Sequence, residues 1–533
     1  MTKRPNFVMF ITDQQRADYL GCYGHPILKT PNIDRIAEQG TSFDKFYVAS
    51  PVCMPNRASL MTGRMPSVHG VRCNGIPLSR QATTFVDLLR DAGYRTALVG
   101  KSHLQNFSRN PPLTAKPEPR SGFHVPSARN LDAFWHDTSA PDYAQESPSF
   151  WKDPRAEVAT PFYGFDLVEL VTGHGDNVGG SYRQWLRERD PDALELLQPD
   201  NELPHDYVCP QARRTPIPEN LYSTAFVADR STAYLDALDD GADDRPFFLM
   251  VSFPDPHHPF NPPGRYWDMY QPDQFPVPDA YLRNDWQPPP HVSAALAQRE
   301  AGTANLSGMG SIAISAREAQ EAQALTCGMI ACIDDAIGGV LDALDARGDR
   351  ENTVVLFTTD HGDHLGDHRL LLKGAEQYQS IVHVPFIWSD PTLSSGPQRT
   401  SAIGSSIDLS ATILERAMIE PFNGMQGRSM LPVLDGRETE HREAAFIQYE
   451  HQRIAAGLGR PPRVHSLIAQ DWRISVFEGA SWGELYDLTN DPGEFDNLWD
   501  APTAMAKKAK LMELLVRAEI EHMDRVPVPT ALA

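Results

Sequence analysis

Residues 6–13 read N-F-V-M-F-I-T-D, and residues 353–361 read T-V-V-L-F-T-T-D-H. Each is a short apolar run that ends in Thr-Asp, which predicts a buried strand with an acid directly after it. Three further runs have the same character, at residues 95–99, 246–253 and 384–388. We predict that all five are buried parallel strands of one sheet.

Helical patterns alternate with these runs: one from Thr30-Pro31 to Gly40, one capped by Thr83 or Thr84 that ends at Gly93, and a long one from Leu325 to Leu344. The alternation predicts an α/β fold, a large and mostly parallel sheet sandwiched by helices. We expect residues 1–425 to form this domain, with loop insertions over about 104–220 laid on the strand ends.

After a helix near residues 409–419 the pattern changes to short alternating segments, including 472–477, and then to a turn-rich stretch at 486–497. We predict that residues 426–533 form a smaller α+β domain on an antiparallel sheet, closed by a helix over about 503–522. Two domains suit a chain of 533 residues.

The charge balance excludes several classes of partner. With 48 basic and 70 acidic residues, the net charge of −22 repels nucleic acids and anionic membranes. The apolar run at 7–11 is too short for a signal peptide, and no later stretch approaches a membrane span. The six cysteines are scattered without a C-x-x-C pair, so we expect a cytoplasmic protein.

Polar side chains follow four of the predicted strands, where ligands bind in an open α/β sheet. They are Asp13 after the first, Lys101 and His103 after the second, His257 and His258 after the third, and Asp360 and His361 after the fourth. One isolated Asp is more often a helix cap, but the pair beside Gln14 and His361 favours a site for Ca²⁺, Mn²⁺ or Mg²⁺.

Residues 50–57 read S-P-V-C-M-P-N-R, followed by A-S-L-M-T-G-R. A helix predicted from Arg57 places Cys53 near a helix N-terminus, which favours anions. For the other five cysteines, a small buried apolar side chain is the better interpretation.

The segment C-M-P-N-R resembles the C-x-P-x-R signature of the sulfatase family, which is part of the alkaline phosphatase superfamily. Further segments are similar to that family's metal, lysine and histidine blocks: N-F-V-M-F-I-T-D-Q-Q-R-A-D, G-K-S-H-L, D-P-H-H-P-F and T-T-D-H-G-D-H-L-G-D-H-R-L-L-L-K-G. The tail segment E-L-Y-D-L-T-N-D-P-G-E-F-D-N-L also resembles the family. The resemblance extends along most of the chain and implies an arylsulfatase-like hydrolase acting on small sulfate esters.

The resemblance also implies roles for individual residues. A maturation enzyme would oxidise Cys53 to formylglycine, whose hydrate attacks the sulfur. One divalent ion, Ca²⁺ or Mn²⁺ with Mg²⁺ as a further option, would be bound by Asp13, Gln14, Cys53, Asp360 and His361. Arg57 would steady the diol, and Lys101 and Lys373 would hold sulfate oxygens. His257 or Lys373 would protonate the leaving alcohol, and His103 would regenerate the aldehyde. Asn74 would touch the anion.

Two alternatives stay open. Gln14 and His361 stand where many sulfatases have an aspartate and an asparagine, which resembles the phosphonate monoester hydrolase and phosphodiesterase branch. That branch typically lacks the pair Lys101 and His103, so we favour sulfate monoesters, with phosphonate monoester and phosphodiester cleavage as side activities. A different class is an inactive anion-binding scaffold with unmodified Cys53. A Pro-rich tail at 526–533 offers a contact within a homo-oligomer.

Overall fold

Every residue of the first strand is buried, and its side chains alternate between two cores. In the computed structural model, which describes residues 4–108, 120–131, 133, 141–238, 243–283, 285–393, 396 and 398–531, this strand is β1 (Asn6–Thr12). Val8 and Phe10 pack into one apolar cluster, and Phe7, Met9 and Ile11 into another on the opposite face. The large sheet is therefore buried on both faces, as its continuous apolar strands predict.

Nine strands form this sheet. Their order is β11 (Arg399–Ser405), β2 (Thr41–Tyr47), β10 (Phe386–Ser389), β8 (Thr353–Thr359), β1, β6 (Phe247–Ser252), β3 (Arg95–Gly100), β4 (Leu167–Thr172) and β5 (Gly179–Gly180). Most neighbouring pairs are parallel, which confirms the predicted fold class. The prediction for residues 384–388 was wrong in direction, because β10 pairs antiparallel with both β8 and β2.

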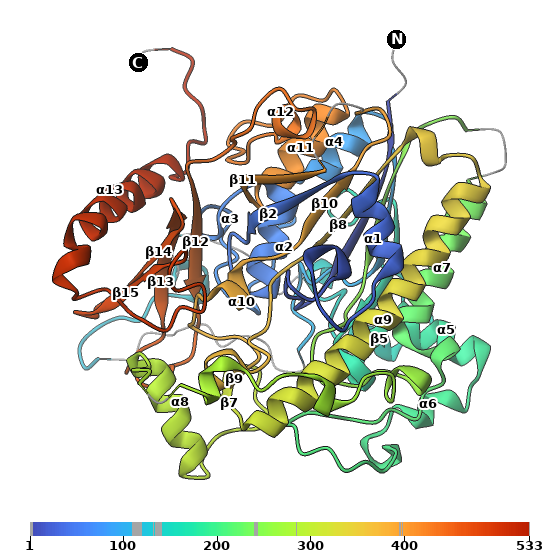
Figure 1. Ribbon diagram of the computed structural model, residues 1–533. Helices are drawn as coiled ribbons and strands as arrows, with labels where there is room; N and C mark the ends of the chain where they lie inside the picture. Colours follow the sequence, from blue (N-terminus) through green and yellow to red (C-terminus); the bar gives the residue numbers. More distant parts are fainter. Residues whose placement is uncertain are drawn as a thin grey trace.

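Helices cover both faces of the sheet (Figure 1). One layer contains α1 (Pro31–Glu38), α5 (Ser181–Arg189), α7 (Ser223–Ala237) and α9 (Ala316–Ala346), and the other contains α2 (Cys53–Thr62), α4 (Phe85–Asp91), α11 (Asp408–Arg416) and α12 (Leu431–Leu434). Helix α3 (Pro66–His69) packs beside α2, with Val68 against the core of the C-terminal part. The connections contain helix α8 (Pro290–Glu300), the short helices α6 (Ala193–Leu196) and α10 (Gln379–Val382), and the strand pair β7 (Ile312–Ala313) and β9 (Leu370–Leu371).

The expectation that no stretch of the sequence approaches a membrane span does not hold for the long helix α9. Within the described ranges it is the one helix long and apolar enough to cross a membrane by length and composition. However, 83% of the apolar 18-residue stretch of this helix is buried inside the protein, where the helix packs against α1 and α7. A helix that is apolar on most sides here serves as a core helix.

The stretch 104–220 holds more regular structure than the predicted loops. Its strands β4 and β5 extend the large sheet, and α5 packs on β4. Residues 109–119, 132 and 134–140 of this stretch lie outside the described residues. β4 is only half buried at its start, so its apolar signal is weaker than that of the central strands.

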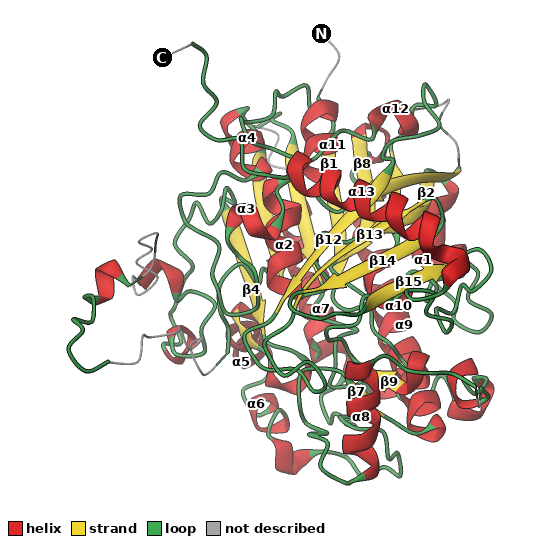
Figure 2. Cartoon of the chain, turned by 90° about the vertical axis from the view of Figure 1, so that its left-hand side faces the viewer, coloured by secondary structure: helices red, strands yellow, loops and turns green. Residues whose placement is uncertain are grey.

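The C-terminal part forms the predicted antiparallel sheet, in the order β12 (Ala444–Glu450), β13 (Arg463–Ala469), β14 (Trp472–Phe477) and β15 (Gly483–Asp487). Helix α13 (Met505–Glu521) covers its outer face, while the inner face turns to the large sheet (Figures 1 and 2). A buried ion pair between Asp408 of α11 and Arg442 joins the two parts. The domain boundary at residue 425 stays a prediction.

Candidate active site

Two aspartates lie together at the carboxyl ends of adjacent central strands. Strands β1 and β8 are parallel and pair Thr12 with Thr359, so Asp13 and Asp360 follow in register. Both side chains are fully buried. Two adjacent buried carboxylates repel each other unless cations compensate them, which indicates a cation-binding site at this edge of the sheet.

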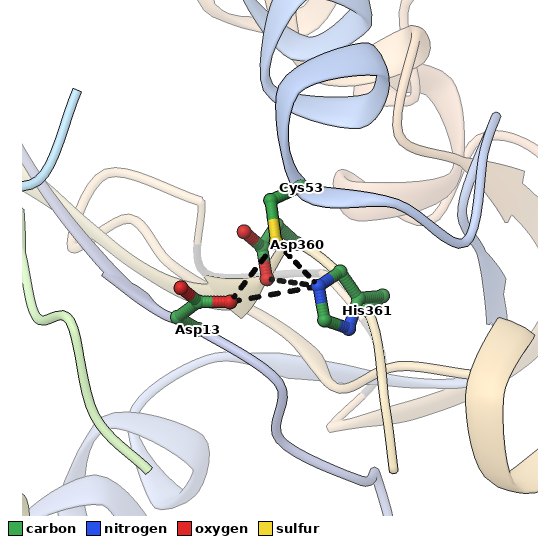
Figure 3. A group of neighbouring side chains, drawn as sticks. All are labelled: Asp13, Cys53, Asp360 and His361. Carbon is green, nitrogen blue, oxygen red and sulfur yellow. Dashed lines mark hydrogen bonds and ion pairs between the residues drawn. The ribbon is translucent and has the colours of Figure 1, made fainter. Parts of the chain in front are cut away.

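Cys53 joins these acids from the facing helix. Helix α2 begins at Cys53, one turn earlier than the start predicted at Arg57. The Cys53 Sγ lies 3.0 Å from His361 Nε2 and 3.6 Å from Asp13 Oδ1 (Figure 3). One ligand atom from each of Asp13, Cys53, Asp360 and His361 falls within 4.8 Å of all the others.

This donor set fits a divalent ion. His361 donates from Nδ1 to the Gly362 carbonyl at 3.0 Å, which leaves its Nε2 lone pair facing the carboxylates. Burial, helped by the ammonium of Lys373, lowers the pKa of His361 to about 3, so the ring is neutral near pH 7 as a ligand must be. Carboxylate oxygens with one imidazole suit Mn²⁺, Mg²⁺ or Ca²⁺.

Arg57 lies one helical turn after Cys53 and is 1% exposed. Its Nε donates to Asp360 Oδ2 at 2.7 Å, and its Nη1 donates to the Lys101 carbonyl and to Ser252 Oγ. Burial alone would raise the pKa of Asp360, but Arg57, His361 and the two lysines lower it below its usual range. Arg57 therefore keeps Asp360 ionised and aimed at the candidate metal position.

Both predicted lysines reach the site and are buried. Lys101 Nζ contacts Asp13 Oδ2 directly. Lys373 Nζ donates to Gln14 Oε1 at 2.5 Å and to His257 Nε2 at 3.0 Å. Burial lowers the pKa of Lys101 to about 7, against the upward pull of acids such as Asp360. Among the described residues, the hydrogen-bond and ion-pair partners of both lysines belong to this one buried group, which places the two side chains where an anion could bind.

Of the two adjacent histidines, His257 is the one that contacts Lys373. Its Nδ1 donates to the His258 carbonyl at 2.6 Å, so its Nε2 accepts from Lys373. His258 Nδ1 lies 3.1 Å from Gln14 Nε2. Gln14 has a left-handed backbone, with φ of 65°, and also donates to Asp363 Oδ2 at 2.6 Å. Gln14 is thus oriented on both sides of its amide.

His103 and Asn74 lie at the edge of this group. His103 stacks on Phe107 with ring centroids 3.8 Å apart, and among the described residues its buried Nδ1 has no partner. Buried Glu146 accepts the backbone N–H groups of residues 103–105 and so holds this turn. Asn74 Oδ1 accepts from the Met54 N–H at 3.0 Å, so in this structure Asn74 braces the residue after Cys53.

The chain that carries this site matches a known protein family over most of its length. The family described as Sulfatase matches residues 5–419. The chain belongs to the sulfatase family. A second family, described as N-sulphoglucosamine sulphohydrolase, C-terminal, matches residues 366–521. The resemblance inferred from the motifs is confirmed.

Three proteins of this kind are similar to the chain over nearly all of its length. The "Arylsulfatase" of Clostridium perfringens is 27% identical over 98% of this chain and 95% of its own. The "Multifunctional alkaline phosphatase superfamily protein PehA" of Trinickia caryophylli is 28% identical over 98% and 96%. The crystal structure of phosphonate monoester hydrolase of Agrobacterium radiobacter has a TM-score of 0.77 and 25% identity, covering 99% of this chain and 98% of that one.

Every residue predicted for the site of this sulfatase therefore lies in or beside one buried group, while their individual roles stay predictions. One residue was missed. His174 contacts Asp13 and Lys101 from the turn after β4. The signal was present, since the run L-V-E-L-V-T at 167–172 is followed by G-H-G, the same pattern of strand and polar residue.

Proposed function

We propose that this sulfatase hydrolyses sulfate monoesters, with aryl sulfates as practical substrates, using formylglycine made from Cys53. The observation that carries the proposal is the position of the Cys53 side chain, within 4.8 Å of ligand atoms of Asp13, Asp360 and His361. Its Sγ occupies the place where the oxygens of a hydrated aldehyde would lie. A bound divalent ion would lower the pKa of such a hydroxyl and make it a nucleophile near neutral pH.

The chain's own cations then bind the sulfate. Lys101 contacts Asp13 and Lys373 contacts Gln14, so the two lysines bring two ammonium groups to one buried site. Such preorganised charges stabilise the negative charge that grows on the sulfate oxygens in the transition state. They also overcome the net charge of −22, which repels anions at long range.

Two groups are placed for proton transfer. The contact of 3.0 Å between Lys373 Nζ and His257 Nε2 forms a relay, and we assign it the protonation of the leaving alcohol oxygen. His103 offers the base on the other side. Burial, and next the charge of Lys101, lowers the pKa of His103 well below its usual value, so its ring is neutral and able to accept a proton.

Gln14 is a neutral amide in the place of a second aspartate. This supports Mn²⁺ over Ca²⁺, because Mn²⁺ is the smaller ion and depends less on having many carboxylate ligands. The same feature, together with the structural similarity to a phosphonate monoester hydrolase, supports a second candidate function. It is the cleavage of phosphonate monoesters or phosphodiesters by the same site. Lys101 and His103 favour sulfate monoesters as the main substrates.

The test combines mass and rate. In protein from its native host, the tryptic peptide ending at Arg57 should contain an aldehyde at position 53, and only thiol there would defeat the formylglycine proposal. The purified enzyme should hydrolyse p-nitrophenyl sulfate faster than a phenyl phosphonate monoester, and the reverse order would select the second function. Cys53→Ala should abolish both activities. The maturation enzyme, cytoplasmic location and oligomeric state stay predictions.

A further inference from the structure

His174 occupies a position between three residues of the site. Its Nε2 lies 2.8 Å from Lys101 Nζ and 3.1 Å from Asp13 Oδ2. Its ring lies face to face with that of His257, with centroids 3.6 Å apart and planes 9° from parallel. The residue is 8% exposed. No other described side chain touches both the Lys101 ammonium and the His257 ring in this way.

The direction of the hydrogen bond follows from chemistry. When Lys101 is an ammonium it can only donate, so the His174 Nε2 is its acceptor and carries no proton; the 3.1 Å approach of that nitrogen to the Asp13 carboxylate, which also only accepts, is then not a hydrogen bond. The ammonium is thereby held between the Asp13 carboxylate and the His174 ring. A lysine side chain has four rotatable bonds, and two acceptors remove most of that freedom.

The turn that carries His174 is built to place it. Gly173 and Gly175 flank it with φ of 81° and 52°, a left-handed backbone that glycine adopts without strain. A side chain at Gly175 would collide with Pro259, and one at Gly173 would approach the Asn177 carbonyl to 2.7 Å. Gly175 therefore lets the turn come this close to the segment that bears His257, and Gly173 lets the turn close on itself at Asn177.

A buried acid locks the same two segments together. Asp176 Oδ1 accepts from Asn261 Nδ2 at 3.2 Å and from Thr215 Oγ1 at 2.8 Å, and Asp176 forms an ion pair with Arg213 at 2.7 Å. Asn261 lies four residues after His257 in sequence. The stack of His174 on His257 is therefore fixed by its surroundings as well as by the rings themselves.

We propose that His174 is a positioning residue of this site: its nitrogen holds the Lys101 ammonium toward the sulfate, and its ring holds the plane of His257. The inference rests on the proposed function for the duties of Lys101 and His257. The His174 nitrogen thus affects anion binding through Lys101, and its ring affects proton delivery through His257. These two effects can be separated by kinetic measurements.

Two variants separate these effects. His174→Phe keeps a ring to stack but loses the acceptor, so the KM for p-nitrophenyl sulfate and the Kd for inorganic sulfate should rise by about tenfold to a hundredfold, with kcat less affected. His174→Gln keeps a polar group near Lys101 but loses the stack. Its kcat should fall more on phenyl sulfate than on p-nitrophenyl sulfate, because the poorer leaving group depends more on protonation.

The control is His465→Phe on strand β13 of the small sheet, which should match wild type in the kinetic and sulfate-binding measurements, although it loses a contact with Glu519. Thermal unfolding followed by circular dichroism checks that each variant is folded. Equal sulfate affinity in wild type and His174→Phe, measured by calorimetry, overturns the assignment of the nitrogen. An unchanged preference between the two leaving groups in His174→Gln overturns the assignment of the ring.

Asp13, His174 and His257 also have ligand atoms within 4.8 Å of one another, a geometry that a second metal ion could use. Metal analysis decides between the ammonium and an ion. Two bound ions per chain, falling to one in His174→Gln, would overturn the proposal. If wild type cleaves neither sulfates nor phosphonates, the proposed function fails, while the binding of inorganic sulfate still decides the role of His174.

Discussion

Asp13 and Asp360 lie side by side because the strands that precede them are in register, with Thr12 paired to Thr359. The two acids lie 347 residues apart in the sequence, and their spatial separation depends on one pair of neighbouring strands. Arg57, Lys101 and Lys373 then surround them with positive charge. This arrangement makes several consequences measurable.

Replacing Asp360 should reduce stability as well as activity. Asp360→Asn removes the carboxylate that pairs with buried Arg57, and an unpaired buried charge costs about 3–5 kcal/mol. Urea unfolding in the presence of a chelator measures this cost apart from metal binding. Asp500→Asn, at an exposed position, is the control. A loss no larger than that of the control contradicts the buried ion pair.

Removing the metal should abolish hydrolysis, and Mn²⁺ should restore it better than Ca²⁺. Gln14→Asp alone should not shift this preference, because the new carboxylate faces Asp363, whose Oδ2 lies 2.6 Å from the Gln14 amide nitrogen. Adding Asp363→Asn removes the repulsion, so the double variant should favour Ca²⁺. Activity after chelation and readdition of each ion is the measurement. Equal behaviour of single and double variants would count against the contact.

Glu146 should control the turn that carries His103. Glu146→Gln replaces one of two acceptor oxygens with a donor that faces backbone N–H groups, so we expect a loss of about 1–3 kcal/mol in unfolding free energy. The kcat should fall as well, because the His103 backbone is held at φ of 56°. Glu438→Gln, on the surface, controls for the charge change. Unchanged kcat would show that the turn is held without Glu146.

Buried His368 should contribute a loss of stability as the solution becomes acidic. Burial, and next the charge of His364, lowers the pKa of His368 from 6.5 to about 3, so between these values the unfolded chain binds a proton that the folded chain does not. Stability is therefore lost as the pH falls through this window, by about 1.4 kcal/mol per pH unit for one such residue.

The variant His368→Phe isolates this effect. Phenylalanine can keep the stack on Tyr378, where the ring centroids are 3.6 Å apart. The slope of unfolding free energy against pH should fall by about one proton relative to wild type. The slope must be compared between wild type and His368→Phe, because other groups also contribute to it. Burial raises the pKa of Glu146 and Asp255 to about 7, and these two acids contribute slopes of the opposite sign. An identical slope in both proteins would contradict the buried neutral His368.

Much of the site could be predicted because its signals are local. A run such as residues 353–359 is apolar throughout since both of its faces are buried, and the polar residue after it marks the strand end. The bounds of β1 and β8 agree with the predicted runs. Cys53 could be singled out from its neighbours in sequence alone.

Other features depend on which segments become neighbours. The sequence of β10 is as apolar as that of β1, yet its direction is set by the chain path that returns it beside β8. Likewise, G-H-G after β4 is only a turn until β4 joins the sheet next to β3 and brings His174 to Lys101. Sequence by itself determined which segments are buried and which side chains follow them, because burial leaves a local pattern. Tertiary structure alone decided strand direction and the partners of His174, since pairing between distant segments leaves no local pattern.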